Sequence, residues 1–217
     1  MLDEAQIRKE IKEIGVRLVE ANLVQGTWGN ISVRLDDKYM LVTPSGLDYM
    51  RLTPEDMVKV EISTLNYEGN IKPTSEKKIH AAIYRERSDI GAVIHSHPFY
   101  SSSIAAARCE LPVLTKDMST VFLGHVRVGR YGLPGTKKLT KATLYALRGR
   151  NACFMANHGI VACAANLIGA FNACRLIEEM SKKFISIETM NLTKKDTFDQ
   201  ADVMTVFRNR KKYKLKN

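Results

Sequence analysis

IGAVIHSHP, residues 90–98, is the stretch around which the rest of the sequence can be interpreted. Its first part is apolar and partly β-branched, which favours a buried strand. Side chains alternate between the two faces of a strand, so His95 and His97 point to the same side, roughly 6.6 Å apart along the backbone. Pro98 cannot continue a ladder and ends the strand. Neutral imidazole is the commonest metal ligand, so this strand end is a candidate metal site, although two histidines alone fit an ordinary strand end equally well.

The composition is that of an ordinary soluble globular protein. The chain has 217 residues, of which 45% are hydrophobic and 26% are charged, enough for one large domain or two small ones. We find no apolar run long enough to span a membrane, and the acidic first residues are unlike a signal peptide. We therefore expect the protein to be located in the cytoplasm. The sequence has no Cys-x-x-Cys pair, so we expect its four cysteines to be small buried residues; they are Cys109, Cys153, Cys163 and Cys174. Cys153 and Cys163 could face each other across a hairpin, but nothing in the sequence requires a bond between them.

The positive charge is concentrated at one end of the chain. Six basic residues and no acidic residue lie within 208–217, so the remainder carries +4 of the total formal charge of +10. Such a run is typical of a solvated terminus, and in some proteins it is a nucleic-acid arm or a source of cations for an anionic substrate.

Helical and strand-like patterns alternate along the chain, which predicts an α/β or α+β protein with a mixed or antiparallel sheet. A first helix is expected from Asp3, with Gln6 in the capping-box position, to a stop at Gly26. The other expected helices are one that begins after Thr74 or Ser75 and carries Ile79 and Ile83, then 100–108, 136–147 with Thr136 as its cap, 167–190, and 199–208 after a linker at 191–198. The expected strands are 31–35, 39–43, 57–62, 90–97, 121–128, 152–156 and 160–164.

Three further segments carry polar groups suited to chemistry. Loops at 26–32 and 43–46 offer glycine, amide and hydroxyl groups that could approach a phosphate, although a turn without a ligand is an equally simple interpretation. Thr74 or Ser75 is expected to cap a helix, whose N-terminus favours anions. Glu76 in its first turn is either a capping acid or a functional carboxylate.

The histidines differ in context. His158 stands at a tight turn between two apolar strands, an unusual place unless it has a partner. His80 is expected to be packed, or to support the site without binding a metal, and His125 is expected on the surface. Three histidines and a carboxylate form a plausible zinc shell, since catalytic zinc has three protein ligands and an open position. Together with phosphate-binding loops, such a shell suggests proton abstraction beside a carbonyl, with the metal stabilising the enediolate.

Five short motifs, in order, resemble the class II aldolase/epimerase family of sugar phosphates, and within it the L-fuculose-1-phosphate aldolases most closely. They are Gly29-Asn30-Ile31-Ser32, Thr43-Pro44-Ser45-Gly46, Thr74-Ser75-Glu76, His95-Ser96-His97-Pro98 and Asn157-His158-Gly159. Each motif is weak alone, but five in the same order and spacing make a specific match over nearly the whole chain.

The resemblance implies a single class II aldolase-like domain over residues 1–207, built in α/β/α layers, followed by the basic tail 208–217. A central, mostly antiparallel mixed sheet would carry helices on both faces. The resemblance also implies a homotetramer with active sites between subunits, and one zinc ion per chain. Its implied metal ligands are Glu76, His95, His97 and His158, with Glu76 also acting as the base. Its implied phosphate-binding residues are Gly29, Asn30, Ser45, Gly46, Thr74 and Ser75.

The implied activity is cleavage of an L-ketose 1-phosphate, such as L-fuculose 1-phosphate, to dihydroxyacetone phosphate and an aldehyde. In the L-fuculose-1-phosphate aldolases a tyrosine from the neighbouring subunit follows an Ile-Pro-Ala-Ile stretch. Here Lys116 and Asp117 stand near that place, and no tyrosine does. Lys116, Asp117 or Tyr213 in the tail could therefore protonate the aldehyde oxygen.

Two alternatives stay open on the sequence alone. One keeps the site but uses it for dehydration of the methylthioribulose-phosphate type, for epimerisation or for decarboxylation. The other is a non-catalytic binding module, either a scaffold or a nucleic-acid binder that uses the tail. The second alternative is disfavoured because scaffolds of this family lack the metal ligands.

Overall fold

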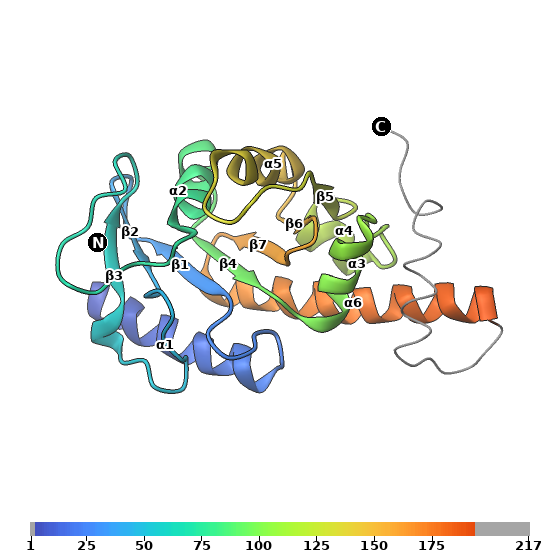
Figure 1. Ribbon diagram of the computed structural model, residues 1–217, viewed down its shortest axis with the longest axis horizontal. Helices are drawn as coiled ribbons and strands as arrows, with labels where there is room; N and C mark the ends of the chain where they lie inside the picture. Colours follow the sequence, from blue (N-terminus) through green and yellow to red (C-terminus); the bar gives the residue numbers. More distant parts are fainter. Residues whose placement is uncertain (1–2, 194–217) are drawn as a thin grey trace.

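The structure is a computed structural model that describes residues 3–193. Within these residues, seven strands form one sheet in the spatial order β3-β2-β1-β4-β7-β6-β5 (Figure 1). Each neighbouring pair is antiparallel except β5 and β6, which are parallel. The strands are β1 (Asn30–Arg34), β2 (Tyr39–Val42), β3 (Val58–Glu61), β4 (Ala92–Ser96), β5 (Arg127–Gly129), β6 (Ala152–Met155) and β7 (Ile160–Ala164).

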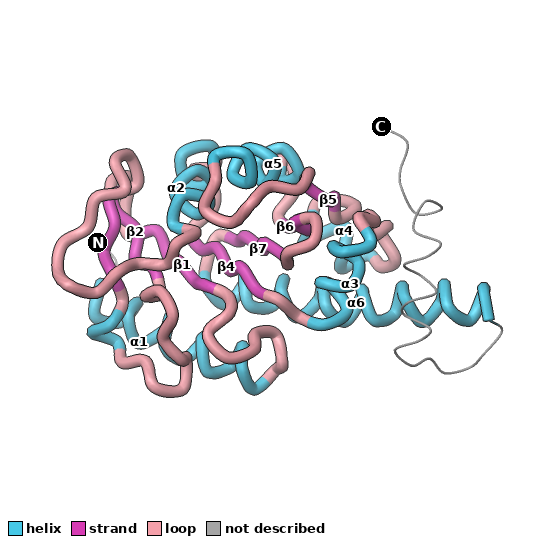
Figure 2. The backbone as a smooth tube through the Cα atoms, in the orientation of Figure 1, coloured by secondary structure: helices cyan, strands magenta, loops and turns pink. Residues whose placement is uncertain are grey.

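Helices cover both faces of this sheet, as the sequence predicted. Figures 1 and 2 show α2 and α5 above the strands, and α1 and α6 below them. The helices are α1 (Glu4–Glu20), the 3-10 turn η1 (Pro54–Asp56), α2 (Lys77–Glu86), α3 (Phe99–Ala107), α4 (Lys116–Phe122), α5 (Lys137–Leu147) and α6 (Leu167–Thr193).

The alternation of side chains along β4 assigns its residues to two separate cores. Ala92 and Ile94 belong to the core between the sheet and α1, α3 and α6, whereas Val93 belongs to the core between the sheet and α2 and α5. With a period of two, His95 and His97 follow Val93 onto the α2 side. The two histidines therefore leave the sheet on the face where α2 begins.

The first helix is shorter than the sequence predicted. The first helix ends at Glu20 rather than at Gly26, because Asn22 adopts the left-handed conformation (φ 55°) and ends it early. Asp3 caps this helix through the backbone N–H of Ala5, but Gln6 bonds to Glu10 and does not complete a capping box.

The expected strand at 121–128 is wrong for residues 121–126, since β5 begins only at Arg127. Thr115 accepts a hydrogen bond from the backbone N–H of Met118 and starts the short helix α4. Leu123 ends α4 in the left-handed conformation (φ 60°), so β5 is limited to Arg127–Gly129. By contrast, Thr136 caps α5 as expected, through the backbone N–H of Leu139.

The end of the chain was only partly predicted. The last described helix continues through Thr193, so the expected linker at 191–198 is wrong for its first three residues, which extend the α-helical turns of α6. The rest of that linker, the expected helix at 199–208, the domain boundary at 207 and the basic tail lie outside the described residues.

Two other sequence-based expectations concern the described residues. All four cysteines are buried, as predicted, and none of them forms a disulfide bond among residues 3–193. Among residues 3–193, no helix combines the length and the apolar character that a membrane span requires. The cytoplasmic location stays a prediction.

Candidate active site

The end of β4 places two imidazoles side by side. β4 is buried along its length, and His95 lies opposite Asn30 of β1 and Val161 of β7. The rings of His95 and His97 lie 4.6 Å apart between centroids. Their Nε2 atoms are separated by only 2.9 Å.

The β6–β7 turn brings a third imidazole to the same point. Asn157 adopts the left-handed conformation (φ 57°) that the tight turn requires, and asparagine tolerates it better than most residues. The His158 ring lies 4.8 Å from the His95 ring and 5.0 Å from the His97 ring. Gly159 permits this approach, because a Cβ there would stand 2.4 Å from the Ser96 carbonyl oxygen.

The ring nitrogens of these three histidines can converge on one metal ion. One nitrogen from each of His95, His97 and His158 lies within 4.8 Å of the others. His95 Nδ1 is 2.8 Å from the carbonyl oxygen of Ile160. Because a carbonyl only accepts, Nδ1 carries the hydrogen, and the Nε2 lone pair of the neutral ring faces the cluster.

Glu76 adds a buried carboxylate to the three imidazoles. Glu76 itself occupies the N-cap position of α2, so the prediction of Thr74 or Ser75 as the cap is wrong. Its side chain makes no capping hydrogen bond, so the capping role considered for Glu76 does not apply either. Its backbone N–H instead bonds to Thr74 Oγ1. Oε2 lies 3.0 Å from His95 Nε2, and Oε1 lies 3.8 Å from His158 Nε2.

Two buried polar atoms in this cluster lack a hydrogen-bond partner in the described protein. They are Glu76 Oε1 and His158 Nδ1. Burying a polar atom without a partner costs free energy, and converging lone pairs repel each other unless a cation lies between them. Three imidazoles are a ligand set of catalytic zinc sites, and a carboxylate is a further common zinc ligand, so these residues fit a divalent metal.

The electrostatics of the cluster keep two of its ligands neutral and the carboxylate charged. Burial, followed by the neighbouring His95, lowers the pKa of His97 to about 3 and that of His158 to about 4. Burial alone would raise the pKa of Glu76, but His95, the Asn30 amide and His158 together bring it well below 4.5. Burial would also lower the pKa of His95, yet Glu76 raises it above 6.5.

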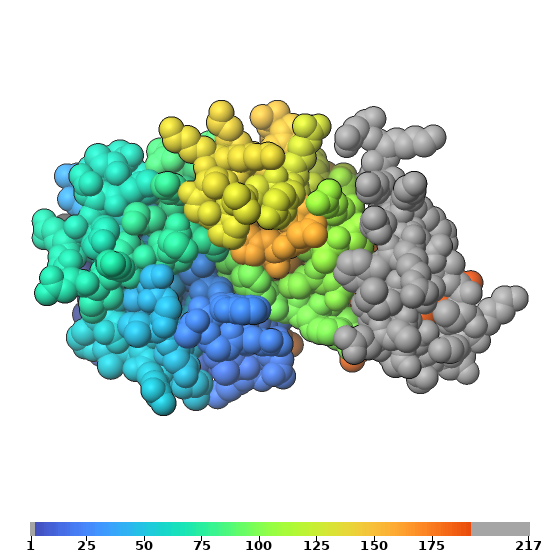
Figure 3. Space-filling model, viewed as in Figure 1, coloured from blue at the N-terminus to red at the C-terminus, as the bar shows by residue number. Residues whose placement is uncertain are grey.

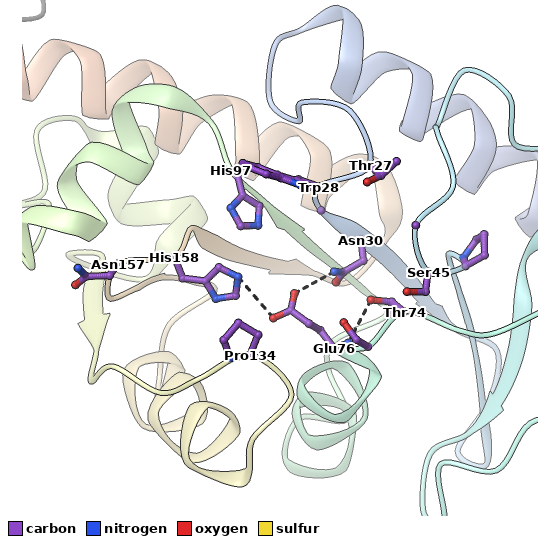
Figure 4. Close-up of a pocket in the computed structure, with 14 residues that line it drawn as sticks. Thr27, Trp28, Asn30, Ser45, Thr74, Glu76, His97, Pro134, Asn157 and His158 are labelled. Carbon is purple, nitrogen blue, oxygen red and sulfur yellow. Dashed lines mark hydrogen bonds and ion pairs between the residues drawn. The ribbon is translucent and has the colours of Figure 1, made fainter.

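Glu76, His97 and His158 line a cavity of about 460 Å³, within the range of about 300–1,000 Å³ common for small-ligand sites. Figure 4 shows Ser45 and Thr74 on the side of Glu76 away from His158. In Figure 3, the surface coloured for the β6–β7 region is set back between the yellow and green segments. All six residues that the sequence proposed for phosphate binding line the cavity: Gly29, Asn30, Ser45, Gly46, Thr74 and Ser75.

The structure also adds lining residues that sequence reasoning did not assign. They include Trp28, Pro134 and Asn157. Trp28 is 63% exposed, and its ring lies 6.0 Å from the His97 ring. The signal for Trp28 was present in the sequence, as an aromatic residue inside a small-residue loop. Nothing in the sequence pointed to Pro134, which lies near His158 and Glu76 in the loop 130–136 between β5 and α5 (Figure 4).

The proposed proton donors are not part of this cavity in the described chain. Lys116 and Asp117 lie in the first turn of α4, outside the lining residues. Tyr213 lies outside the described residues. His125 pairs with Glu110 at 3.3 Å, away from the cluster, and His80 is fully buried and hydrogen-bonded outside the metal-ligand group, as expected for both.

A family model described as the Class II Aldolase and Adducin N-terminal domain matches residues 9–185. Two curated relatives are similar over most of their length. A 5-deoxy-D-ribulose 1-phosphate aldolase of Bacillus thuringiensis serovar kurstaki is 37% identical over 79% of this chain and 80% of its own. A 5-methylthioribulose-1-phosphate/5-deoxyribulose-1-phosphate aldolase of Rhodospirillum rubrum is 33% identical over 82% of this chain and 80% of its own.

A solved structure gives the same picture for the fold. An L-fuculose 1-phosphate aldolase superposes with a TM-score of 0.80 at 34% identity, covering 95% of this chain and 96% of that one.

Proposed function

The chain belongs to the class II aldolase and adducin N-terminal domain family, as its motifs predicted, and from that premise we propose that it is a sugar-phosphate aldolase. It cleaves a ketose 1-phosphate to dihydroxyacetone phosphate and an aldehyde. The observation that carries this proposal is a cavity lined by Glu76, His97, His158 and loops of glycine, amide and hydroxyl groups, with the third imidazole, His95, directly beneath it in contact with Glu76 and His97. The alternative of a scaffold without catalysis does not account for that donor set.

The metal of this proposal is zinc, one ion per chain, held by His95, His97, His158 and, in the resting site, Glu76. Hydrogen bonding by His95 Nδ1 to Ile160 orients the first of these ligands. A divalent ion there supplies Lewis acidity, which polarises the substrate carbonyl and balances developing negative charge.

The phosphate of the substrate binds at the opposite end of the cavity. Thr74 and Ser75 directly precede Glu76 and α2, whose N-terminal N–H groups and helix dipole favour an anion. Gly29 has φ +110°, and a Cβ there would lie 2.8 Å from Val24 Cγ1 and 2.9 Å from the His95 carbonyl oxygen. Only glycine therefore fits this loop, and its bare backbone is open to a phosphate oxygen.

The proposed reaction breaks the C3–C4 bond of the ketose. A base takes the proton of the C4 hydroxyl, the C3–C4 bond breaks, and C4 leaves as the aldehyde carbonyl. The electron pair stays with the phosphate-bearing fragment, and a proton must be added at C3. Glu76, a charged carboxylate at rest, takes up a proton from solvent and gives it to C3; we assign it this role because it lines the cavity and its Oε1 has no hydrogen-bond partner within the described protein. The reverse reaction uses the same carboxylate to remove that proton.

The base and acid at the C4 oxygen are proposed to be Lys116, Asp117 or Tyr213. Lys116 and Asp117 do not line the cavity of their own chain. In the proposed homotetramer, with active sites between neighbouring subunits, they come from the adjacent chain. Tyr213, in the basic tail, lies outside the described residues.

We propose two candidate substrates. L-Fuculose 1-phosphate follows from the motif resemblance and the matched solved structure. 5-Deoxy-D-ribulose 1-phosphate follows from the names of the curated relatives at 37% and 33% identity. Both are 1-phosphates of ketoses and would present the same phosphate and carbonyl groups to the cavity.

The test is a coupled assay for dihydroxyacetone phosphate, run on the zinc-loaded protein with both sugars, together with mass analysis of the products. We expect dihydroxyacetone phosphate and an aldehyde in equal amounts. Glu76→Gln should abolish their release. Glu110→Gln is the matched control, since it alters another partly buried carboxylate paired with a histidine, outside the cavity.

Absence of dihydroxyacetone phosphate with every ketose 1-phosphate tested would contradict the proposal. A dehydration product, which keeps the carbon chain intact, would show that the same site catalyses dehydration, as in the dehydratase alternative.

A further inference from the structure

A buried chain of hydrogen bonds leads from Glu76 away from the cavity into the layer between the sheet and α2. Asn30 Nδ2 lies 3.1 Å from Glu76 Oε2, and Asn30 Oδ1 lies 2.5 Å from His80 Nε2. His80 Nδ1 lies 2.6 Å from Ser32 Oγ, which lies 2.8 Å from the Tyr84 hydroxyl. All five residues are at most 6% exposed.

The direction of each bond in this chain follows from the carboxylate. A carboxylate only accepts, so the Asn30 Nδ2 group must face Glu76, and the Asn30 carbonyl oxygen must face His80. That oxygen also only accepts, so His80 Nε2 carries the hydrogen. Burial lowers the pKa of His80 to about 3, so the ring is neutral and Nδ1 accepts from the Ser32 hydroxyl. Tyr84 in turn donates to Ser32.

This order has a consequence for the two oxygens of Glu76. Oε2 is held by the Asn30 amide beside His95, whereas Oε1 has no hydrogen-bond partner within the described protein. Were the Asn30 amide to turn over, its carbonyl would face the carboxylate and repel it. A neutral His80 with its hydrogen on Nε2 prevents that turn, because only this orientation gives both groups a partner.

We propose that His80 is a positioning residue of the reaction, which fixes the Asn30 amide so that Glu76 is held by Oε2 and presents Oε1 to C3 of the substrate. His80 touches neither substrate nor Glu76 and acts through Asn30. The inference rests on the proposed function and adds to it the residue that determines which carboxylate oxygen carries the proton.

The first test compares two substitutions at His80. Leucine fills similar space without any hydrogen bond, whereas glutamine can donate to Asn30 and accept from Ser32. We expect His80→Leu to lower kcat at least 10-fold with KM within 3-fold of wild type, since the phosphate loops are untouched. We expect His80→Gln to restore most of kcat.

Thr143→Val is the matched control. Thr143 is 1% exposed in α5, on the same side of the sheet, and its hydroxyl bonds only within its own helix, to Leu139 O. It should lose stability as other buried polar substitutions do, while kcat stays within 2-fold. A purely structural role of His80 predicts that His80→Leu and Thr143→Val lose equal stability and keep equal kcat, and that result would overturn the proposal.

A second measurement does not depend on activity. The ¹⁵N shifts of His80 in the metal-free protein report which ring nitrogen carries the hydrogen, and we expect the Nε2–H tautomer across neutral pH. An Nδ1–H tautomer or a protonated ring at pH 7 would overturn the proposal even in an active enzyme. If wild type released no dihydroxyacetone phosphate but showed the Nε2–H tautomer, the proposed function would fail while the hydrogen-bond order stood.

Discussion

The turn that carries His158 offers a sharp test of how the three imidazoles are held. In Gly159→Ala, the new methyl group would stand 2.4 Å from the Ser96 carbonyl oxygen and 3.3 Å from both His95 Cε1 and His97 Nδ1. An ordinary non-bonded separation is about 3.5 Å. The closest neighbour is backbone, so no side-chain rotation relieves the contact. The end of β4 and the β6–β7 turn must move apart by about 1 Å.

The expected effects follow from that displacement. Forcing extra volume into a packed region costs about 1–3 kcal/mol of folding free energy. Metal–ligand distances tolerate only about 0.2 Å, so zinc affinity should fall by about 10- to 100-fold, the range seen when supporting contacts of a metal site are lost. Urea unfolding measures the first effect, and competition with a chromophoric chelator measures the second.

Gly91→Ala is the matched control at the other end of the same strand pair. Its methyl group would stand 2.2 Å from the Ala165 carbonyl oxygen, an equally severe backbone contact far along β4 from the histidines. It should lose similar stability and keep zinc affinity. If folded Gly159→Ala bound zinc as tightly as Gly91→Ala and wild type, the reasoning about the site would be refuted.

Three further predictions follow from the same geometry. His80 has a pKa of about 3 when folded against about 6.5 unfolded, so the unfolded chain takes up the extra proton and stability is lost as pH falls from 6.5 towards 3. His80→Leu removes this titrating group, so its unfolding free energy, measured with urea between pH 6 and 4, should fall less steeply with pH than that of the wild type, by up to about 1.4 kcal/mol per pH unit. The same pH dependence of the unfolding free energy in both proteins would contradict this prediction. Trp28→Ala should raise KM about 2- to 10-fold, for an aromatic contact worth about 0.5–1.5 kcal/mol, without lowering the melting temperature, because the indole is 63% exposed; an unchanged KM would place the substrate elsewhere. Zinc at 100 times its Kd should stabilise the wild type by about 2.7 kcal/mol, and thermal unfolding of a His97→Ala variant should not respond to zinc.

Much of the site could be predicted because its signals are local. The alternation of His95 and His97 along a strand, the glycine-rich loops and the helix start at Glu76 each depend on a few neighbouring residues. The side of the sheet that the histidines face depends on the same alternation. These features were therefore accessible from sequence before any tertiary contact was known.

The remainder depends on contacts between distant segments. No local pattern shows that Asn30 lies opposite His95, that His80 bonds to Ser32 and Asn30, or that Pro134 reaches the cavity. The register of the sheet creates the first two relations, and the path of a long loop creates the third. The error at Gly26 has a different cause, since Asn22 in the left-handed conformation ends the first helix where apolar periodicity gave no warning. At 121–128 the unexpected helix α4, capped by Thr115, occupies the start of the expected strand.

The central claim is that Glu76 moves a proton at the carbon that becomes C3 of the ketose, and hydrogen exchange tests it without knowledge of the aldehyde. Zinc-loaded protein is incubated with dihydroxyacetone phosphate in D₂O, and the hydroxymethyl hydrogens are followed by proton NMR. The account predicts that wild type and Glu110→Gln exchange one of the two hydrogens stereospecifically, while Glu76→Gln exchanges neither above the uncatalysed rate. Equal exchange by Glu76→Gln and wild type, or no exchange by wild type, would contradict it.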